Sequence, residues 1–188
     1  MTETNATTDP TDGDDVAAAE AAAAFRFVVD WQALDAASAD AIRAFWQREG
    51  AIVDPAQIAQ RLPQVVMHAT TADGEVAGVC TALLATPPML AQPFYYWRTF
   101  VGARWRRTQL VMMLLKRSCT LLEDYAARHG HPAIGVLLEL ENERFRERGR
   151  MAVWWNPRFV YIGRSARGLD LRVHYFKGAR LKPPPSKP

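Results

Sequence analysis

A strand, a basic turn, a long amphipathic helix and a second strand follow one another between Pro93 and Glu141. Aromatic and β-branched residues (FYYWRTFV) predict the first strand over Phe94–Val101. Apolar residues at steps of three and four predict the helix over 108–129, with Gly130 as its stop. The apolar run PAIGVLLELE, 132–141, predicts an interior strand parallel to the first. Two parallel strands joined by a helix form a right-handed βαβ unit, so this segment requires a fold that mixes helices and sheet.

The flanking segments predict a small sheet with further helices. Asp73-Gly74 marks a tight turn between two antiparallel strands, and Asp54-Pro55 marks the start of a short helix. The other expected elements are strands over 25–30, 65–67 and 76–84, helices over 41–48 (starting from Ser38 to Asp40) and 142–155, and a hairpin of 159–163 with 169–176. The order β-α-α-β-β-β-α-β-α-β-β predicts an α+β fold in α/β/α layers, with a mixed, mostly antiparallel sheet.

Composition divides the chain into one expected domain with two tails. Residues 1–24 hold six acidic and no basic residues, which predicts a disordered acidic tail, and 182–188 (KPPPSKP) predicts an extended one. A single domain is expected over 25–181. The first segment lacks the basic start of a signal peptide, and no apolar run is long enough to span a membrane. We therefore expect a cytoplasmic protein without membrane contact, in which Cys80 and Cys119 are buried free thiols.

Basic residues crowd the point where the long helix begins. Arg104, Arg106 and Arg107 lie in the turn before it. All 23 basic residues but only 14 of the 20 acidic ones follow residue 24, so this part of the chain carries a net charge of about +9. Arginine is unfavourable beside a helix N-terminus unless an anion offsets it, and helix N-termini bind phosphates. The turn therefore favours a phosphate-bearing ligand, although a solvated basic surface would give the same composition.

The order of elements, with its basic turn, resembles the GNAT superfamily of acyl-CoA-dependent N-acyltransferases over residues 25 to about 180. In that family the turn reads Arg/Gln-x-x-Gly-x-Gly/Ala, and the matching segment here is RRTQLV, 106–111. Gln109 and Val111 replace its two small residues. The family's Glu-Asn pair before the fourth helix is similar to Glu141-Asn142. The chain thus looks like a divergent member.

The resemblance implies acetyl-CoA or another acyl-CoA as co-substrate and an amine as acceptor. The coenzyme pyrophosphate would lie at the turn, and backbone N–H groups near the end of the fourth strand would hold the thioester carbonyl. Asn142 would contact the pantetheine arm, or serve simply as a helix cap. The residues that the resemblance implies for coenzyme binding are Phe100, Val101, Arg106, Arg107, Thr108, Gln109, Leu110, Val111 and Asn142.

Candidates for proton transfer are fewer. Many family members carry a tyrosine acid about seven residues after the asparagine, where this chain has Gly149. Tyr161 or Tyr175 from the last hairpin, or Tyr96 on the fourth strand, are alternatives, and Glu139 is placed where a base could reach the substrate. Tyr95 and Tyr96 must point to opposite faces of the sheet. The four histidines are scattered, so we expect no metal.

Two other functions stay open. The lost small residues and the missing tyrosine favour a non-catalytic protein of the same fold that binds coenzyme or dimerises. The basic charge and Trp97, Trp105, Trp154 and Trp155 among arginines would allow bases of single-stranded nucleic acid to stack, but no recognition motif accompanies them. The last hairpin is a candidate homodimer surface.

Overall fold

A single eight-stranded sheet organises the chain in the computed structural model, which describes residues 24–141 and 150–183. The strand order is β1-β2-β3-β4-β5-β8-β7-β6. All neighbours are antiparallel except β4 and β5. The strands are β1 (Arg26–Val29), β2 (Val65–Thr70), β3 (Val76–Ala85), β4 (Phe94–Val101), β5 (Gly135–Leu140), β6 (Val153–Trp155), β7 (Arg158–Arg164) and β8 (Asp170–Tyr175). The expected α+β fold with one parallel pair is confirmed.

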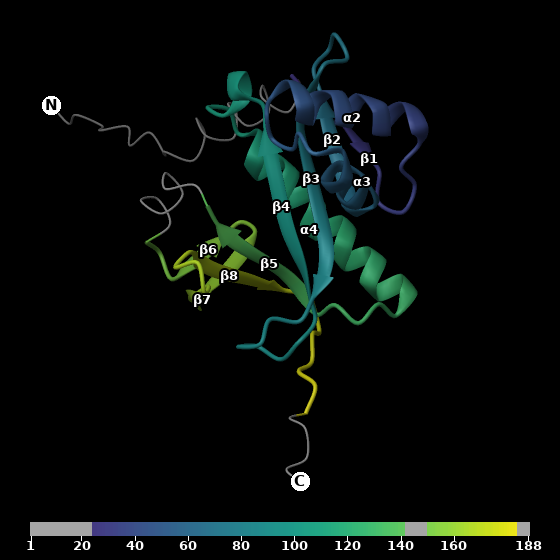
Figure 1. The fold of residues 1–188 in the computed structure, drawn as a ribbon. Coiled ribbons are helices and arrows are strands. Elements are labelled where there is room, and N and C mark those ends of the chain that lie inside the picture. The colour runs from purple at the N-terminus through teal and green to yellow at the C-terminus, as the bar shows by residue number, and fades with distance from the viewer. Residues whose placement is uncertain (1–23, 142–149, 184–188) are drawn as a thin grey trace, which may run out of the picture.

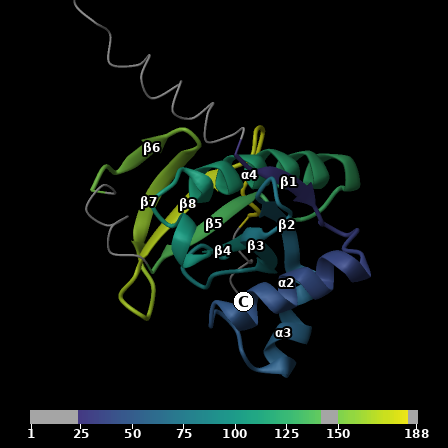
Figure 2. The ribbon, with the colours of Figure 1, turned by 90° about the horizontal axis from the view of Figure 1, so that it is seen from above.

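Helices cover both faces of the sheet. Figure 2 shows α4 (Leu110–His129) on one face and α2 (Ala36–Arg48) with α3 (Pro55–Arg61) on the other. Short 3-10 turns, η1 (Leu62–Gln64) and η2 (Ala103–Trp105), precede β2 and α4. Each helix buries an apolar stripe, and the two largest core clusters lie on opposite sides of the sheet. The core residues that α4 contributes include Leu110, Leu114, Leu115, Cys119 and Leu122.

The sheet opens between its two parallel strands. β4 and β5 pair only at Tyr95 with Val136, Tyr96 with Leu137 and Trp97 with Leu138. Beyond these pairs β4 stays on β3 as far as Val101, while β5 stays on β8 as far as Leu140. The carboxyl ends of β4 and β5 therefore separate, as Figure 1 shows. This split leaves strand edges without a neighbouring strand in the middle of the sheet.

Two predicted helix starts were displaced by a few residues. Helix α2 begins at Ala36 rather than near Ala41, because Asp35 accepts a hydrogen bond from the Ser38 N–H (2.7 Å) and caps the helix earlier. Helix α4 begins at Leu110 rather than Thr108, whose hydroxyl accepts from the Leu110 N–H (3.2 Å). The predicted Asp54 cap of α3 is confirmed by its bond from the Ala56 N–H (3.1 Å).

The helix predicted over 142–155 was wrong at its end. Residues 142–149 lie outside the described part, but Val153–Trp155 form strand β6, paired with β7. Valine and tryptophan favour strands, and Asn156-Pro157 after them marks a turn, so the local signal for a hairpin was present in the sequence. The charged residues before it led to the helical prediction.

Candidate functional site

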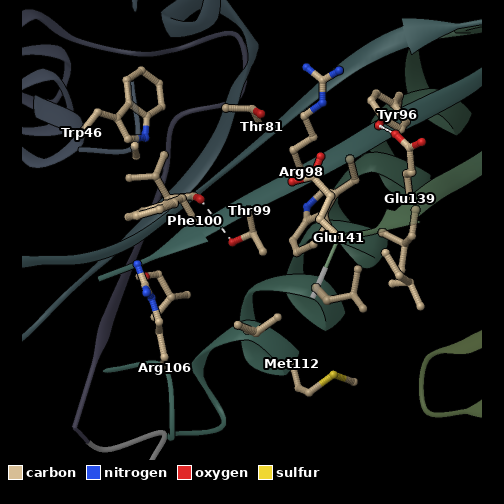
Figure 3. A pocket seen from close by; sticks show the side chains of 18 of the residues that line it. Trp46, Thr81, Tyr96, Arg98, Thr99, Phe100, Arg106, Met112, Glu139 and Glu141 are labelled. Carbon is tan, nitrogen blue, oxygen red and sulfur yellow. Dashed lines mark hydrogen bonds between the residues drawn. The ribbon is translucent and has the colours of Figure 1, made fainter. Parts of the chain in front are cut away.

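A cavity of about 860 Å³ occupies the split between β4 and β5 (Figure 3). Alternation along the strands sends successive side chains to opposite faces of the sheet, so both faces contribute to its wall. On the side of α2 and α3 it is lined by Trp46, Ile52, Thr81, Tyr96, Phe100 and Glu139. On the side of α4 it is lined by Trp97, Val101, Val111, Met112, Leu115 and Leu138. The cavity thus joins the two faces of the sheet.

The end of β4 directs backbone groups into this split. The Gly102 N–H donates to the Ala77 carbonyl of the β3 side (2.9 Å). Because backbone groups alternate along a strand, the N–H of Phe100 also faces β3, and those of Thr99 and Val101 face the gap. The N–H of Val101 therefore faces the gap, where a donor for the thioester carbonyl was expected. The second N–H that faces the gap belongs to Thr99 and not to Phe100. Phe100 contributes its ring to the cavity wall instead.

The start of α4 borders the same cavity. Thr108 donates its hydroxyl hydrogen to the Trp105 carbonyl (2.8 Å) and caps the Leu110 N–H. Leu110 itself is fully buried, so its side chain belongs to the core and not to a ligand site. The first-turn N–H groups of a helix lack partners within the helix, and Val111 and Met112, which supply two of them, line the cavity. Exposed Gln109 lies beside them.

The three arginines of the turn differ in their surroundings. Arg106 donates its Nε–H to the Val101 carbonyl (3.2 Å) and lies over the Phe100 ring (5.3 Å), so it is held against the end of β4. Arg107 is exposed and lines the cavity. Arg104 stacks on Trp105 (4.8 Å) and does not line the cavity. Arg106 also lines the cavity, but its Nε–H bonds the Val101 carbonyl, so Arg107 is the better placed of the two to meet a phosphate.

Tyr96 and Glu139 meet at the point where the strands separate. The Tyr96 hydroxyl donates a hydrogen bond to Glu139, whose carboxylate also accepts from Arg167 (3.2 Å) of the β7–β8 turn. The same arginine binds Glu141 (2.8 Å). Only 8% of the Glu139 side chain is exposed. Arg167 is therefore the ion-pair partner of both carboxylates.

Both members of this pair have shifted pKa values. Burial, followed by the hydrogen bond to Glu139, raises the pKa of Tyr96, so its hydroxyl stays protonated. Burial alone would raise the pKa of Glu139 as well. Hydrogen bonds from Ser165 and Tyr96 and the charge of Arg167 outweigh it, so the pKa of Glu139 lies below its usual value. Glu139 is therefore ionised and weakly basic, which suits electrostatic positioning better than proton abstraction.

Other predicted site residues lie elsewhere. Tyr95 points to the α4 side, where its hydroxyl bonds His131 Nδ1 (2.8 Å), so Tyr96 is the member of the pair that faces the cavity, as alternation required. Tyr161 is 40% exposed on β7, Tyr175 is 42% exposed on β8, and neither lines the cavity. Asn142 lies outside the described residues.

Several cavity residues were missed at the level of sequence. Thr99 and Thr81 lie next to predicted positions, and the alternation of β4 and β3 could have placed them. Arg61, from the end of α3, also lines the cavity, and Arg167, from a hairpin turn, binds the cavity residue Glu139. No pattern in the sequence joins these distant residues to β4, because tertiary packing alone brings them there.

The thiols, histidines and tryptophans fit structural roles. Cys80 and Cys119 are buried and free, and burial raises the pKa of each thiol to about 12. Trp97 is 6% exposed, which removes it from a stacking surface, whereas Trp155 is 71% exposed. Over residues 24–141 and 150–183, no group of three His, Cys, Asp or Glu side chains is arranged to hold a metal ion, and no helix is long and apolar enough to cross a membrane.

Comparison with known proteins places the fold. No protein-family profile and no curated protein matches the sequence. Among solved structures, a GNAT family N-acetyltransferase from Escherichia coli in complex with CoA matches with a TM-score of 0.52 and 15% identity, over 81% of each chain. An acetyltransferase of the GNAT family from Streptococcus pneumoniae matches with a TM-score of 0.50 and 9% identity, over 81% of this chain and 99% of its own. Together with the split sheet, these matches show that the chain has the fold of the GNAT superfamily and diverges widely from these members in sequence.

Proposed function

We propose that this protein transfers an acyl group from an acyl-CoA to an amine. The observation that carries the proposal is the cavity in the split of β4 and β5, because side chains from both faces of the sheet line it, so that two reactants could meet there. A thioester can enter from the α4 side and an amine from the side of α2 and α3. The fold supports the same reading, since a GNAT N-acetyltransferase of this fold was solved with CoA.

The α4 side offers the groups that a coenzyme requires. The N–H groups of Val111 and Met112, together with the helix dipole and Arg107, provide a site for a pyrophosphate. From there a pantetheine arm would run along the wall that Leu115 and Leu138 provide. The family's Gly-x-Gly/Ala is replaced by Gln109 and Val111, whose side chains occupy space that glycine leaves empty. The pyrophosphate would accordingly sit further from the helix axis, within reach of Arg107.

The reaction needs polarisation of the carbonyl more than a strong base. The N–H groups of Thr99 and Val101 would hold the thioester oxygen as negative charge develops on it. The ammonium group of the acceptor first loses a proton to water, and the free amine attacks the carbonyl carbon. As the new C–N bond forms, the nitrogen gives its extra proton to water, and the C–S bond breaks with its electron pair leaving on the sulfur. Tyr96 is the candidate acid for the departing thiolate, because its raised pKa keeps the hydroxyl protonated. Glu139 would then position Tyr96 and attract the cationic acceptor.

Charge reversal in the turn tests the coenzyme half of this proposal. Arg107→Glu should weaken binding of acetyl-CoA, measured by calorimetry, by roughly 10- to 100-fold, the usual worth of a charge-assisted contact. Arg104→Glu is the matched control, since Arg104 lies in the same exposed turn and outside the cavity. An equal loss in both variants would indicate unspecific attraction to the basic surface. Unchanged affinity in Arg107→Glu would remove the pyrophosphate from this site.

A non-catalytic coenzyme-binding protein is the second candidate. The observation that favours it is the double ion pair of Arg167 with Glu139 and Glu141, which engages two acids that line the cavity and makes Glu139 a weaker base. Such a protein would bind acetyl-CoA with the same Arg107 dependence, yet release no CoA with any amine. Thiol release on adding amines to the acetyl-CoA complex therefore separates the two functions.

A further inference from the structure

Two arginines that face the acceptor side of the cavity, Arg61 and Arg98, have no carboxylate partner among the described residues. Arg98 lies on β4, and Arg61 in the last turn of α3. Both line the cavity, and the ion pairs of the described residues include neither. The nearest acid of the cavity, Glu139, is already bound by Arg167 and Tyr96. The two guanidinium groups therefore place uncompensated positive charge at one wall.

The sheet register brings these groups together. Arg98 is paired with Thr81 across β4 and β3, and Thr81 with Val65, the first residue of β2 after α3 and η1. Side chains of paired residues lie on the same face of a sheet. Figure 3 shows Arg98 between Thr81 and the Tyr96–Glu139 pair. Arg61, Thr81 and Arg98 thus line the same cavity as the apolar side chains of Trp46 and Ile52.

The two positive charges oppose each other. Burial lowers the pKa of Arg61, and the neighbouring charge of Arg98 lowers it further. Like charges facing one partly buried space are unfavourable unless an anion lies between them. Arg98 contacts Tyr96, with its guanidinium 4.4 Å from the ring centre and a side-chain hydrogen bond between the two residues, but this neutral partner does not compensate the charge of Arg98.

We propose that Arg61 and Arg98, with Thr81, form an anion subsite that binds a carboxylate of the acceptor, so that the acceptor is an amine that also carries a carboxylate. The inference rests on the proposed acyl transfer, because it names the substrate class of that reaction. Guanidinium groups match the planar carboxylate with paired hydrogen bonds. The amino group of such a molecule would point from this wall toward the split, where Thr99 and Val101 direct their N–H groups.

Matched acceptors test the subsite. Amino acids of increasing chain length and their carboxamides are supplied to the full-length protein with acetyl-CoA, and CoA release is followed. Members of the two series share the amine and differ in the carboxylate. The acids should show a KM lower by roughly 10- to 100-fold, as expected for a charge-assisted contact. Equal use of both series, or preference for carboxamides or aminoalkyl phosphates, would overturn the proposal.

Variants connect that preference to the two arginines. Arg98→Gln and Arg61→Gln should raise the KM for the acids toward that for the carboxamides while leaving the affinity for acetyl-CoA unchanged. Arg26→Gln, on exposed β1, is the control. Arg61→Gln should not lower Tm by more than this control, because it relieves repulsion. A preference that persists in both cavity variants would contradict the assignment.

Binding measurements distinguish an error in the anion-subsite proposal from an error in the proposed acyl transfer. Calorimetry with the acids and carboxamides is performed with and without acetyl-CoA. If acetyl-CoA binds but the acids bind no more tightly than the carboxamides, the subsite is wrong and the coenzyme site stands. If acetyl-CoA does not bind, the proposed function is wrong. The anion subsite would still be supported in that case if the acids bind more tightly than the carboxamides and if Arg98→Gln abolishes this difference.

Discussion

At the scale of single residues, the surroundings of Glu139 keep its carboxyl group ionised. Glu139 is nearly buried, yet the hydrogen bonds from Ser165 and Tyr96 and the positive charge of Arg167 keep its pKa low. The sequence made Glu139 a candidate because it lies near the end of a strand, and alternation along β4 required Tyr95 and Tyr96 to face opposite sides of the sheet. It could not predict Arg167, which reaches β5 from a turn almost thirty residues away.

Arg167→Gln should raise the pKa of Glu139, because the burial that opposes ionisation remains while a favourable charge is lost. A carboxylate with a lowered pKa stabilises the fold above its unfolded pKa and loses that contribution as pH falls through its folded pKa. Acid unfolding of the variant should therefore begin at a higher pH than in the native protein. Carboxyl NMR titration measures the pKa directly.

Arg164→Gln serves as its control, since Arg164 pairs with Asp170 (3.3 Å) in the same hairpin and does not touch Glu139. An unchanged Glu139 titration in Arg167→Gln would mean that the ion pair contributes nothing in solution.

At the scale of elements, the start of α4 contributes both to stability and to the proposed coenzyme site. The sequence predicted this helix within two residues, because its apolar period is long and regular. Its exact start depended on the Thr108 hydroxyl, which bonds both Trp105 and Leu110. Strand β6 was missed because its three residues are stabilised mainly by pairing with β7, a tertiary effect that short patterns reveal poorly.

Thr108→Ala should lower the free energy of unfolding by about 1 kcal/mol, since the cap of the Leu110 N–H is lost. Urea denaturation measures this change. Thr108→Ser keeps a hydroxyl and should retain most of the stability. If serine is as destabilising as alanine, the threonine methyl group rather than its hydrogen bonds would account for the effect.

On the scale of the whole molecule, the cavity depends on how far two strands diverge. Residues from α2, α3, β3, β4, α4, β5 and β6 reach one cavity because β4 and β5 pair at three positions and then separate. The order of elements in the sequence predicted the fold and the parallel pair. It did not predict the volume of the split or the acceptor wall, since both depend on packing between segments distant in sequence. Homodimerisation through the last hairpin stays a prediction.

The central claim, that an acyl-CoA lies in this split, is tested most directly by following backbone amide NMR signals during titration with CoA. The account predicts saturable shifts at Thr99, Val101, Val111 and Met112, with little change at the exposed end of β1. Shifts confined to other surfaces, or no saturable change at these amides, would contradict it.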